Sequence, residues 1–90
     1  MMKSDVVEKV AEKAGMKKIE AERAVNAFLD TVKQGLMNGE KVRFLGFGTF
    51  QVVERKARLG HDPRSGNEIK IAARNIPQFK PGKPLKDSIN

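Results

Sequence analysis

Apolar residues recur three and four positions apart over the first 38 residues, which is the spacing of one face of an α-helix. The pattern predicts a first helix that ends at Gly15 and a second helix from about Lys18 to Met37. Ser4 is expected to cap the first helix, with Asp5 in its first turn, where a negative charge is favourable. The apolar positions are Val6, Val7, Val10, Ala11 and Ala14, then Ala21, Ala24, Val25, Phe28, Leu29, Val32 and Leu36.

The period of the pattern changes at Glu40. Residues 41–45 and 49–54 alternate between polar and apolar side chains on either side of Gly46-Phe47-Gly48, and this predicts a β-hairpin over residues 41–54. A short helix is expected near the end of the chain, from about Leu85 to Ile89. Helices followed by antiparallel strands indicate an α+β fold.

Residues 55–74 predict a long two-stranded ribbon. The second strand of the hairpin can continue through residues 55–59, and residues 60–67 are dense in turn-forming residues. A returning strand then follows over residues 68–74, clearest in Glu68-Ile69-Lys70-Ile71. This stretch has few large apolar side chains, so it would be hard to pack against a core and would protrude as an arm.

The positive charge of the chain is concentrated in residues 55–86. This segment has nine Lys and Arg residues and only two acidic residues, so its net charge of +7 equals that of the whole chain. Over residues 1–38, by contrast, seven basic and six acidic residues are interleaved, as on an ordinary solvated surface. A positive surplus on one ribbon indicates a binding surface for a polyanion such as DNA.

Length and composition point to a second subunit. Ninety residues make one domain with a small core, and the chain has no Cys and one His. Disulfides and a metal site are therefore not available to stabilise it, and no cofactor is expected. We expect a homodimer. No apolar run has the length of a membrane span, and the first ten residues lack a signal-peptide core, so a cytoplasmic location is expected.

Pro63 stands in the middle of the turn and has two interpretations. It can be an ordinary proline at the second position of a β-turn. It can also be an apolar wedge that slips between base pairs, because a proline has no amide donor to desolvate. The sequence leaves both open.

Three motifs together resemble the HU and integration host factor family of bacterial histone-like proteins. They are GFGTFQVVERKAR, the turn GHDPRSG and PQFKPGKPLKD, and the resemblance extends over the full chain. It implies an intertwined α+β dimer with a two-helix base, an antiparallel β-saddle, long β-ribbon arms and a short C-terminal helix. One domain over residues 1–90 would comprise a helical dimerisation part (1–38), the saddle and C-terminal helix (41–54 and 75–90) and the DNA-binding arm (55–74).

The resemblance also implies a set of site residues. Pro63 would intercalate into the minor groove, and the amides around Gly46 and Gly48 would approach phosphates closely. The other residues implied in DNA binding are Lys3, Arg55, Lys56, Arg58, His61, Arg64, Lys70, Arg74, Lys80, Lys83 and Lys86. The dimer core implied by the resemblance comprises Phe28, Phe44, Phe47, Phe50 and Phe79.

The chain departs from the family pattern at several positions. His61 and Asp62 stand where the family often has Arg-Asn, and Ala72 replaces a frequent proline. Val53 and Asn75 occupy positions where a basic residue is common. These departures predict a weaker or differently distributed grip on phosphates. His61 can strengthen binding at low pH, where a histidine gains positive charge, or it can be a merely solvated histidine at the tip.

The implied function is architectural: binding double-stranded DNA through the minor groove with low sequence preference, and bending and compacting it in the nucleoid. A preference for bent, nicked or gapped DNA and a heterodimer with a paralogue are possible within the family. The alternatives are a sequence-selective relative like integration host factor, and an RNA-binding protein of the ribosomal type. RNA-binding proteins often display aromatic residues for base stacking, and the arm has none. An enzyme is not expected, because no nucleophile and base pair is evident.

Overall fold

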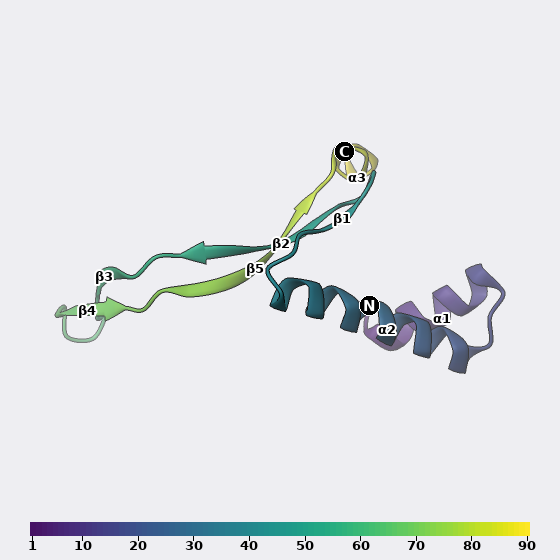
Figure 1. Ribbon diagram of the computed structural model, residues 1–90, viewed down its shortest axis with the longest axis horizontal. Helices are drawn as coiled ribbons and strands as arrows, with labels where there is room; N and C mark the ends of the chain where they lie inside the picture. Colours follow the sequence, from purple (N-terminus) through teal and green to yellow (C-terminus); the bar gives the residue numbers. More distant parts are fainter. The chain divides into compact units, whose positions relative to one another are not determined.

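The computed structural model describes all residues, 1–90, and has the α+β composition that the sequence predicts (Figure 1). The chain forms two compact units, Met1–Gln34 and Gly35–Asn90. The elements in chain order are α1 (Lys3–Ala14), α2 (Lys18–Met37), β1 (Val42–Phe44), β2 (Gly48–Arg55), β3 (Arg58–His61), β4 (Glu68–Ile71), β5 (Arg74–Pro81) and α3 (Lys83–Ile89). None of the three helices has the length and apolar character that a membrane crossing requires.

The helical unit confirms the two predicted helices but corrects the start of the first. Helix α1 begins at Lys3, and Met2 occupies the N-cap position in place of the predicted Ser4. The Asp5 carboxylate accepts a hydrogen bond of 2.7 Å from the Met2 backbone N–H, which fixes the start of the helix ahead of Ser4. Gly15 ends the helix in the left-handed conformation (φ 65°), as predicted for a glycine stop.

A three-stranded antiparallel sheet forms the centre of the second unit, with strand order β1-β2-β5. The register pairs Phe50 with Val42 on one side and with Phe79 on the other, so one face of the sheet is apolar. β5 extends from residue 74 to 81 and contains Pro77. It is an edge strand of this sheet, where a missing backbone donor is tolerated.

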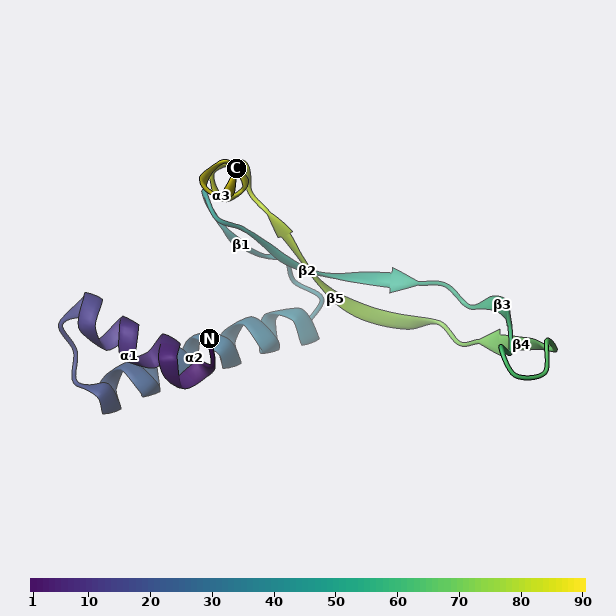
Figure 2. The ribbon, with the colours of Figure 1, turned by 180° about the vertical axis from the view of Figure 1, so that it is seen from behind.

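β3 and β4 form a second, two-stranded sheet at the far end of the ribbon from β1 and α3 (Figure 2). The pairing of Arg58 with Ile71 continues the register in which Arg55 pairs with Arg74. The ladder is interrupted at residues 56–57 and 72–73, however, so the prediction of unbroken strands over 55–59 and 68–74 was wrong. Three of these four residues are alanines, which offer little side chain for the cross-strand pairs that stabilise a ladder.

The last helix begins two residues earlier than predicted. α3 extends over Lys83–Ile89, with Gly82 as its N-cap and a proline in its first turn. A proline fits there because its missing N–H would have no partner in the helix.

Little of the chain is buried. Only Val7, Ala21 and Val32 are buried apolar residues, and no large side chain is fully buried. The chain exposes 7833 Å², whereas a compact protein of its mass exposes about 5,200 Å². The core of a single copy is therefore small for a domain that is stable by itself.

Candidate nucleic-acid interface

The face of the sheet opposite the phenylalanines is polar. Arg43 in β1, Thr49 in β2 and Lys80 in β5 form one row across the three strands, because Thr49 pairs with both of the others. In the next row of the same face, the Gln51 Nε2 donates a hydrogen bond of 3.0 Å to the Gln78 Oε1. Two cations and two amides thus share one side of the sheet.

A hollow of about 650 Å³ opens beside these rows. Four cationic residues line it: Lys41, Arg43, Lys80 and Lys83. None of their side chains takes part in a hydrogen bond or an ion pair within the chain, and no acidic side chain lines the hollow. The hollow can therefore attract and hold an anion. Its other lining residues are Phe44, Leu45, Gly46, Gly48, Thr49, Gln51, Pro81, Gly82 and Pro84.

Gly46 and Gly48 line this hollow, and each position needs a glycine for a different structural reason. Gly46 has φ 82°, in the left-handed region that favours glycine. A Cβ atom on Gly48 would lie 2.6 Å from the Phe79 Cζ and 2.8 Å from the Lys80 carbonyl oxygen. The β1–β2 turn therefore requires Gly46 for its backbone conformation and Gly48 for packing within the chain, whatever approaches from outside.

Farther along the ribbon, on the same face, the Gln51–Gln78 pair is followed by two more cross-strand pairs. Val53 pairs with Ile76, and this row is apolar, which reflects the absence of a basic residue at position 53. Arg55 then pairs directly with Arg74, and both side chains are exposed. Two like charges face each other where the ribbon leaves the sheet, an arrangement that destabilises a pair of strands.

The arm itself combines cations with apolar packing. Arg58 pairs with Ile71, and Lys70 pairs with Leu59. Gly60 is needed on this ribbon, because a Cβ atom there would lie 2.8 Å from the Ile71 Cδ1. Ile71 thus packs across the ribbon over Gly60, while the neighbouring charged residues remain exposed.

The tip is an ordered turn over residues 62–67. The Asp62 N–H donates to the Asn67 carbonyl oxygen and the Gly66 N–H donates to the Asp62 carbonyl oxygen, both at 2.8 Å. The Asp62 Oδ1 accepts a third bond of 2.8 Å from the Arg64 N–H. Asp62 therefore stabilises the turn through its hydrogen bonds. The sequence alone indicated only its negative charge. Pro63 lies exposed inside this turn, as the turn interpretation expects, and its exposure leaves the wedge interpretation open.

The predicted cations are all exposed, but they lie in different parts of the chain. Lys80 and Lys83 meet at the hollow, whereas Lys86 lies farther along α3. Lys56 lies in the ladder interruption, His61 ends β3 opposite Glu68, and Arg64 is part of the tip. Lys3 belongs to the helical unit.

Lys41 and Arg43 line the hollow and were not among the predicted site residues. The alternation of residues 41–45 could have indicated them, because side chains two positions apart in a strand lie on the same face.

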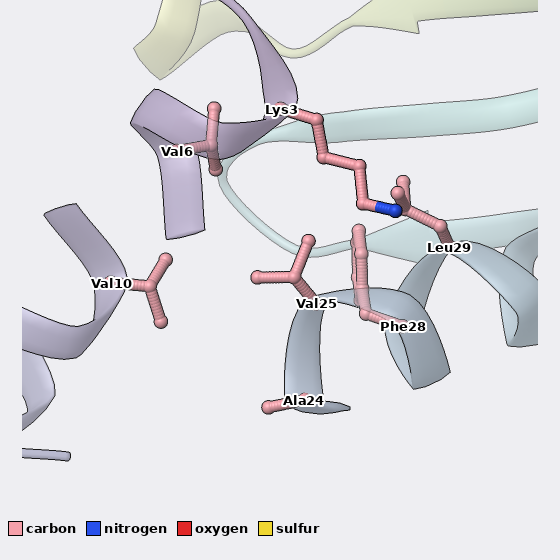
Figure 3. A pocket seen from close by; sticks show the side chains of 7 residues that line it. All are labelled: Lys3, Val6, Val10, Ala24, Val25, Phe28 and Leu29. Carbon is pink, nitrogen blue, oxygen red and sulfur yellow. The ribbon is translucent and has the colours of Figure 1, made fainter. Parts of the chain in front are cut away.

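An apolar groove of about 550 Å³ lies between α1 and α2 in the helical unit (Figure 3). Val6 and Val10 contribute from α1, and Val25, Phe28 and Leu29 from α2. Lys3 of α1 also lines the groove, and its aliphatic part extends along it (Figure 3). Phe28 is 47% exposed in the single chain, a large fraction for a residue of an apolar groove.

The other four phenylalanines form one cluster on the sheet. Ring centroids are separated by 6.2 Å for Phe44 and Phe50, 5.6 Å for Phe47 and Phe79, and 4.7 Å for Phe50 and Phe79. They therefore contact one another within a single chain. Phe47 nevertheless remains 49% exposed, and the neighbouring Leu45 is 90% exposed.

Comparisons with known proteins identify the family. A family model described as bacterial DNA-binding protein matches residues 1–90. The chain belongs to the HU family. It is 51% identical over 87 residues to the DNA-binding protein HU of Lactococcus lactis, covering 97% of this chain and 96% of that protein. It is 47% identical over 89 residues to the HU-alpha protein of Vibrio cholerae, covering 99% of both chains.

Solved structures of HU proteins share the fold. An Anabaena HU–DNA cocrystal structure has a TM-score of 0.92 at 37% identity and covers 99% of this chain and 97% of that one. HU from Thermotoga maritima has a TM-score of 0.72 at 33% identity, with both chains fully covered. The α+β HU fold implied by the sequence is thus confirmed. The described chain has no group of three or more His, Cys, Asp or Glu residues that could hold a metal ion.

Proposed function

We propose that this protein is an architectural component of the bacterial nucleoid that binds double-stranded DNA through the minor groove, bends it and compacts it with low sequence preference. One observation carries the proposal. Cations recur along the ribbon, from Lys80 beside the hollow through the Arg55–Arg74 pair to Arg58 and Lys70, which lie on opposite faces of the arm. An extended cationic ribbon without internal ion pairs is suited to an extended polyanion.

The arm would enter the minor groove, with Pro63 as the intercalating residue. Pro63 is exposed in a turn that three hydrogen bonds hold together without its participation. A wedge needs such support, because unstacking a base step costs a few kcal/mol. Arg58, Arg64, Lys70 and Arg74 would contact phosphates or line the groove, and Lys56 and His61 would add to the charge near them.

A homodimer would present two such arms to one DNA molecule. A second copy covering the groove of Phe28 and Leu29 would bury apolar side chains that are about half exposed in one chain. The exposed sides of Phe47 and Leu45 would be covered in the same way. Lys3 and Lys86 would be further contacts to flanking DNA.

Low sequence preference follows from the side chains available on the sheet. Gln51 and Gln78 could read base edges, but the hydrogen bond of 3.0 Å from the Gln51 Nε2 to the Gln78 Oε1 already uses one donor and one acceptor position of this pair. The remaining polar groups of the ribbon are mainly Lys and Arg, which bind phosphates of any sequence. This observation favours a general DNA-bending protein over a sequence-selective relative such as integration host factor.

Replacing Arg58 by Ala tests the proposal. Binding to every duplex should weaken, and the slope of log affinity against log salt should flatten by about one for each phosphate that the variant no longer neutralises. Lys13 in α1 offers a control, because Lys13→Ala removes the same charge from the interleaved helical surface. An unchanged slope for Arg58→Ala would show that this residue does not bind a phosphate.

A further inference from the structure

The tip of the arm has a negative charge directly beside Pro63. Asp62 precedes Pro63 in the chain, and consecutive Cα atoms lie about 3.8 Å apart. We propose that the Asp62 carboxylate determines selectivity among forms of DNA, because it opposes insertion of Pro63 into intact duplex more strongly than into gapped duplex. This inference rests on the proposed function, in which Pro63 intercalates, and adds to it a residue that weakens binding to ordinary DNA.

Hydrogen bonds hold the Asp62 carboxylate beside Pro63. The Asp62 Oδ1 accepts a bond of 2.8 Å from the Arg64 N–H, so the side chain spans Pro63 along the chain. The backbone of Asp62 is fixed as well, because its N–H donates to Asn67 and its carbonyl oxygen accepts from Gly66. Asp62 is half-buried in the turn, whereas Pro63 is exposed. The carboxylate cannot turn away without breaking the bond to Arg64, so it would accompany Pro63 to the DNA.

No cation of the arm neutralises this carboxylate. Arg64 donates to it through the backbone N–H, and the Arg64 guanidinium group forms no ion pair with it. His61 and Lys70, the other basic residues near the turn, form no ion pair with it either. Glu68 lies opposite His61 at the end of the ladder and adds a second negative charge nearby. The charge of Asp62 would therefore meet DNA phosphates without a cation between them, and like charges repel.

The strength of this repulsion depends on the form of the DNA. The minor groove of intact duplex is about 6 Å wide, so phosphates of both strands lie close to any side chain inside it. A gap lacks one nucleotide with its phosphate, and the interrupted strand can move away from the tip. The repulsion on Asp62 is therefore smaller at a gap. Selectivity can be obtained by repelling the competing partner as well as by attracting the preferred one.

Two substitutions separate the charge of Asp62 from its role in the turn. Asparagine keeps a side-chain oxygen that can accept the bond from the Arg64 N–H, but it has no charge. Glutamate keeps the charge, but its longer side chain is not suited to this local bond. If the charge causes the selectivity, only Asp62→Asn should increase affinity.

The test compares Asp62→Asn with Glu54→Gln, which removes one negative charge from the base of the same ribbon. Each full-length protein is titrated at about 50 mM salt with one duplex sequence, intact and with a single-nucleotide gap. Divalent cations are left out, because Mg²⁺ can bridge a carboxylate and a phosphate.

We expect Asp62→Asn to bind intact duplex about fivefold more tightly for each inserted tip, the effect of one repulsion between unit charges about 4 Å apart in water. On gapped duplex the gain should be less than about twofold, because fewer phosphates face the residue. The gain on intact duplex should shrink at about 200 mM salt, where ions screen the repulsion. Glu54→Gln should change both affinities equally, and Asp62→Glu should give no gain.

Three outcomes would overturn the inference. Asp62→Asn could bind intact duplex no more tightly than the unsubstituted protein, which would leave Asp62 as a turn residue alone. Its gain could be equal on intact and gapped duplex, or equal to that of Glu54→Gln, which would indicate a general effect of net charge. Asp62→Glu could give the same gain, which would indicate an effect of turn geometry. If the unsubstituted protein bound no duplex, or if Pro63→Ala left DNA bending unchanged, the proposed function itself would fail, so the two failures are distinguishable.

Discussion

Arg55 and Arg74 lie directly opposite each other on β2 and β5, at the point where the ribbon leaves the three-stranded sheet. Like charges in this arrangement destabilise a pair of strands by up to about 1 kcal/mol. No acidic residue occupies a neighbouring pair on that face, since Val53–Ile76 precedes it. A bound phosphate would remove the repulsion. The pair therefore favours binding of DNA but lowers the stability of the free protein.

Arg74→Gln should therefore separate stability from binding. The melting temperature of the free protein should rise by about 1–3 °C at low salt, because the repulsion is removed. DNA affinity should fall, because glutamine cannot neutralise a phosphate. Thermal denaturation and duplex titration measure the two effects. A control is Arg23→Gln, which removes an exposed cation from α2. A lower melting temperature at low salt would contradict the account of this pair.

Pro63→Ala should reduce DNA bending and the preference for distorted DNA more than it reduces affinity for intact duplex. The turn should persist, because its hydrogen bonds involve Asp62, Arg64, Gly66 and Asn67. The measurement is energy transfer between labelled DNA ends, combined with titration of intact and nicked duplex. Equal reductions of affinity on both DNA forms would show that Pro63 is only a turn residue.

Phe28→Ala should destabilise the dimer. Truncating a phenylalanine in a packed interface costs several kcal/mol, so the melting temperature should fall by about 10 °C and should depend more strongly on protein concentration. Ile19→Ala is the matched control, because Ile19 is 57% exposed in α2 and does not line the groove. Sedimentation gives the mass. Similar small effects for both variants would indicate that the groove is not the dimer interface.

Much of the fold could be predicted because its periodicity is simple. The boundaries of α2 follow from a long helical pattern, and the β1–β2 hairpin follows from alternation around a glycine turn. The start of α1 was predicted wrongly because the Asp5 carboxylate accepts a hydrogen bond from the Met2 N–H. Met2 is therefore the N-cap, and Ser4 lies within the helix. The ladder interruption at residues 56–57 was also missed, since local strand propensity does not show which cross-strand pairs are too small to hold a ladder.

The candidate site was predicted in part. The cations of the arm were evident from charge alone, and Lys80 and Lys83 were implied by the family resemblance. Lys41 and Arg43 lie outside residues 55–86, which carry the whole net positive charge. The charges of the remaining residues cancel, so the net charge of a segment did not indicate these two cations. Only the register shows that Arg43 shares a row with Lys80, while the acidic residues nearest in sequence lie elsewhere. The role of Asp62 in the turn also required the hydrogen bonds.

We expect this protein to recognise deformable duplex DNA and not a particular sequence. The most direct test is a competition titration at fixed salt with one duplex, intact and nicked or gapped, a scrambled duplex and a structured RNA. We expect the nicked or gapped form to compete best, with intact and scrambled duplexes equal. Tight binding to one intact sequence, or a preference for the RNA over every DNA, would contradict the claim.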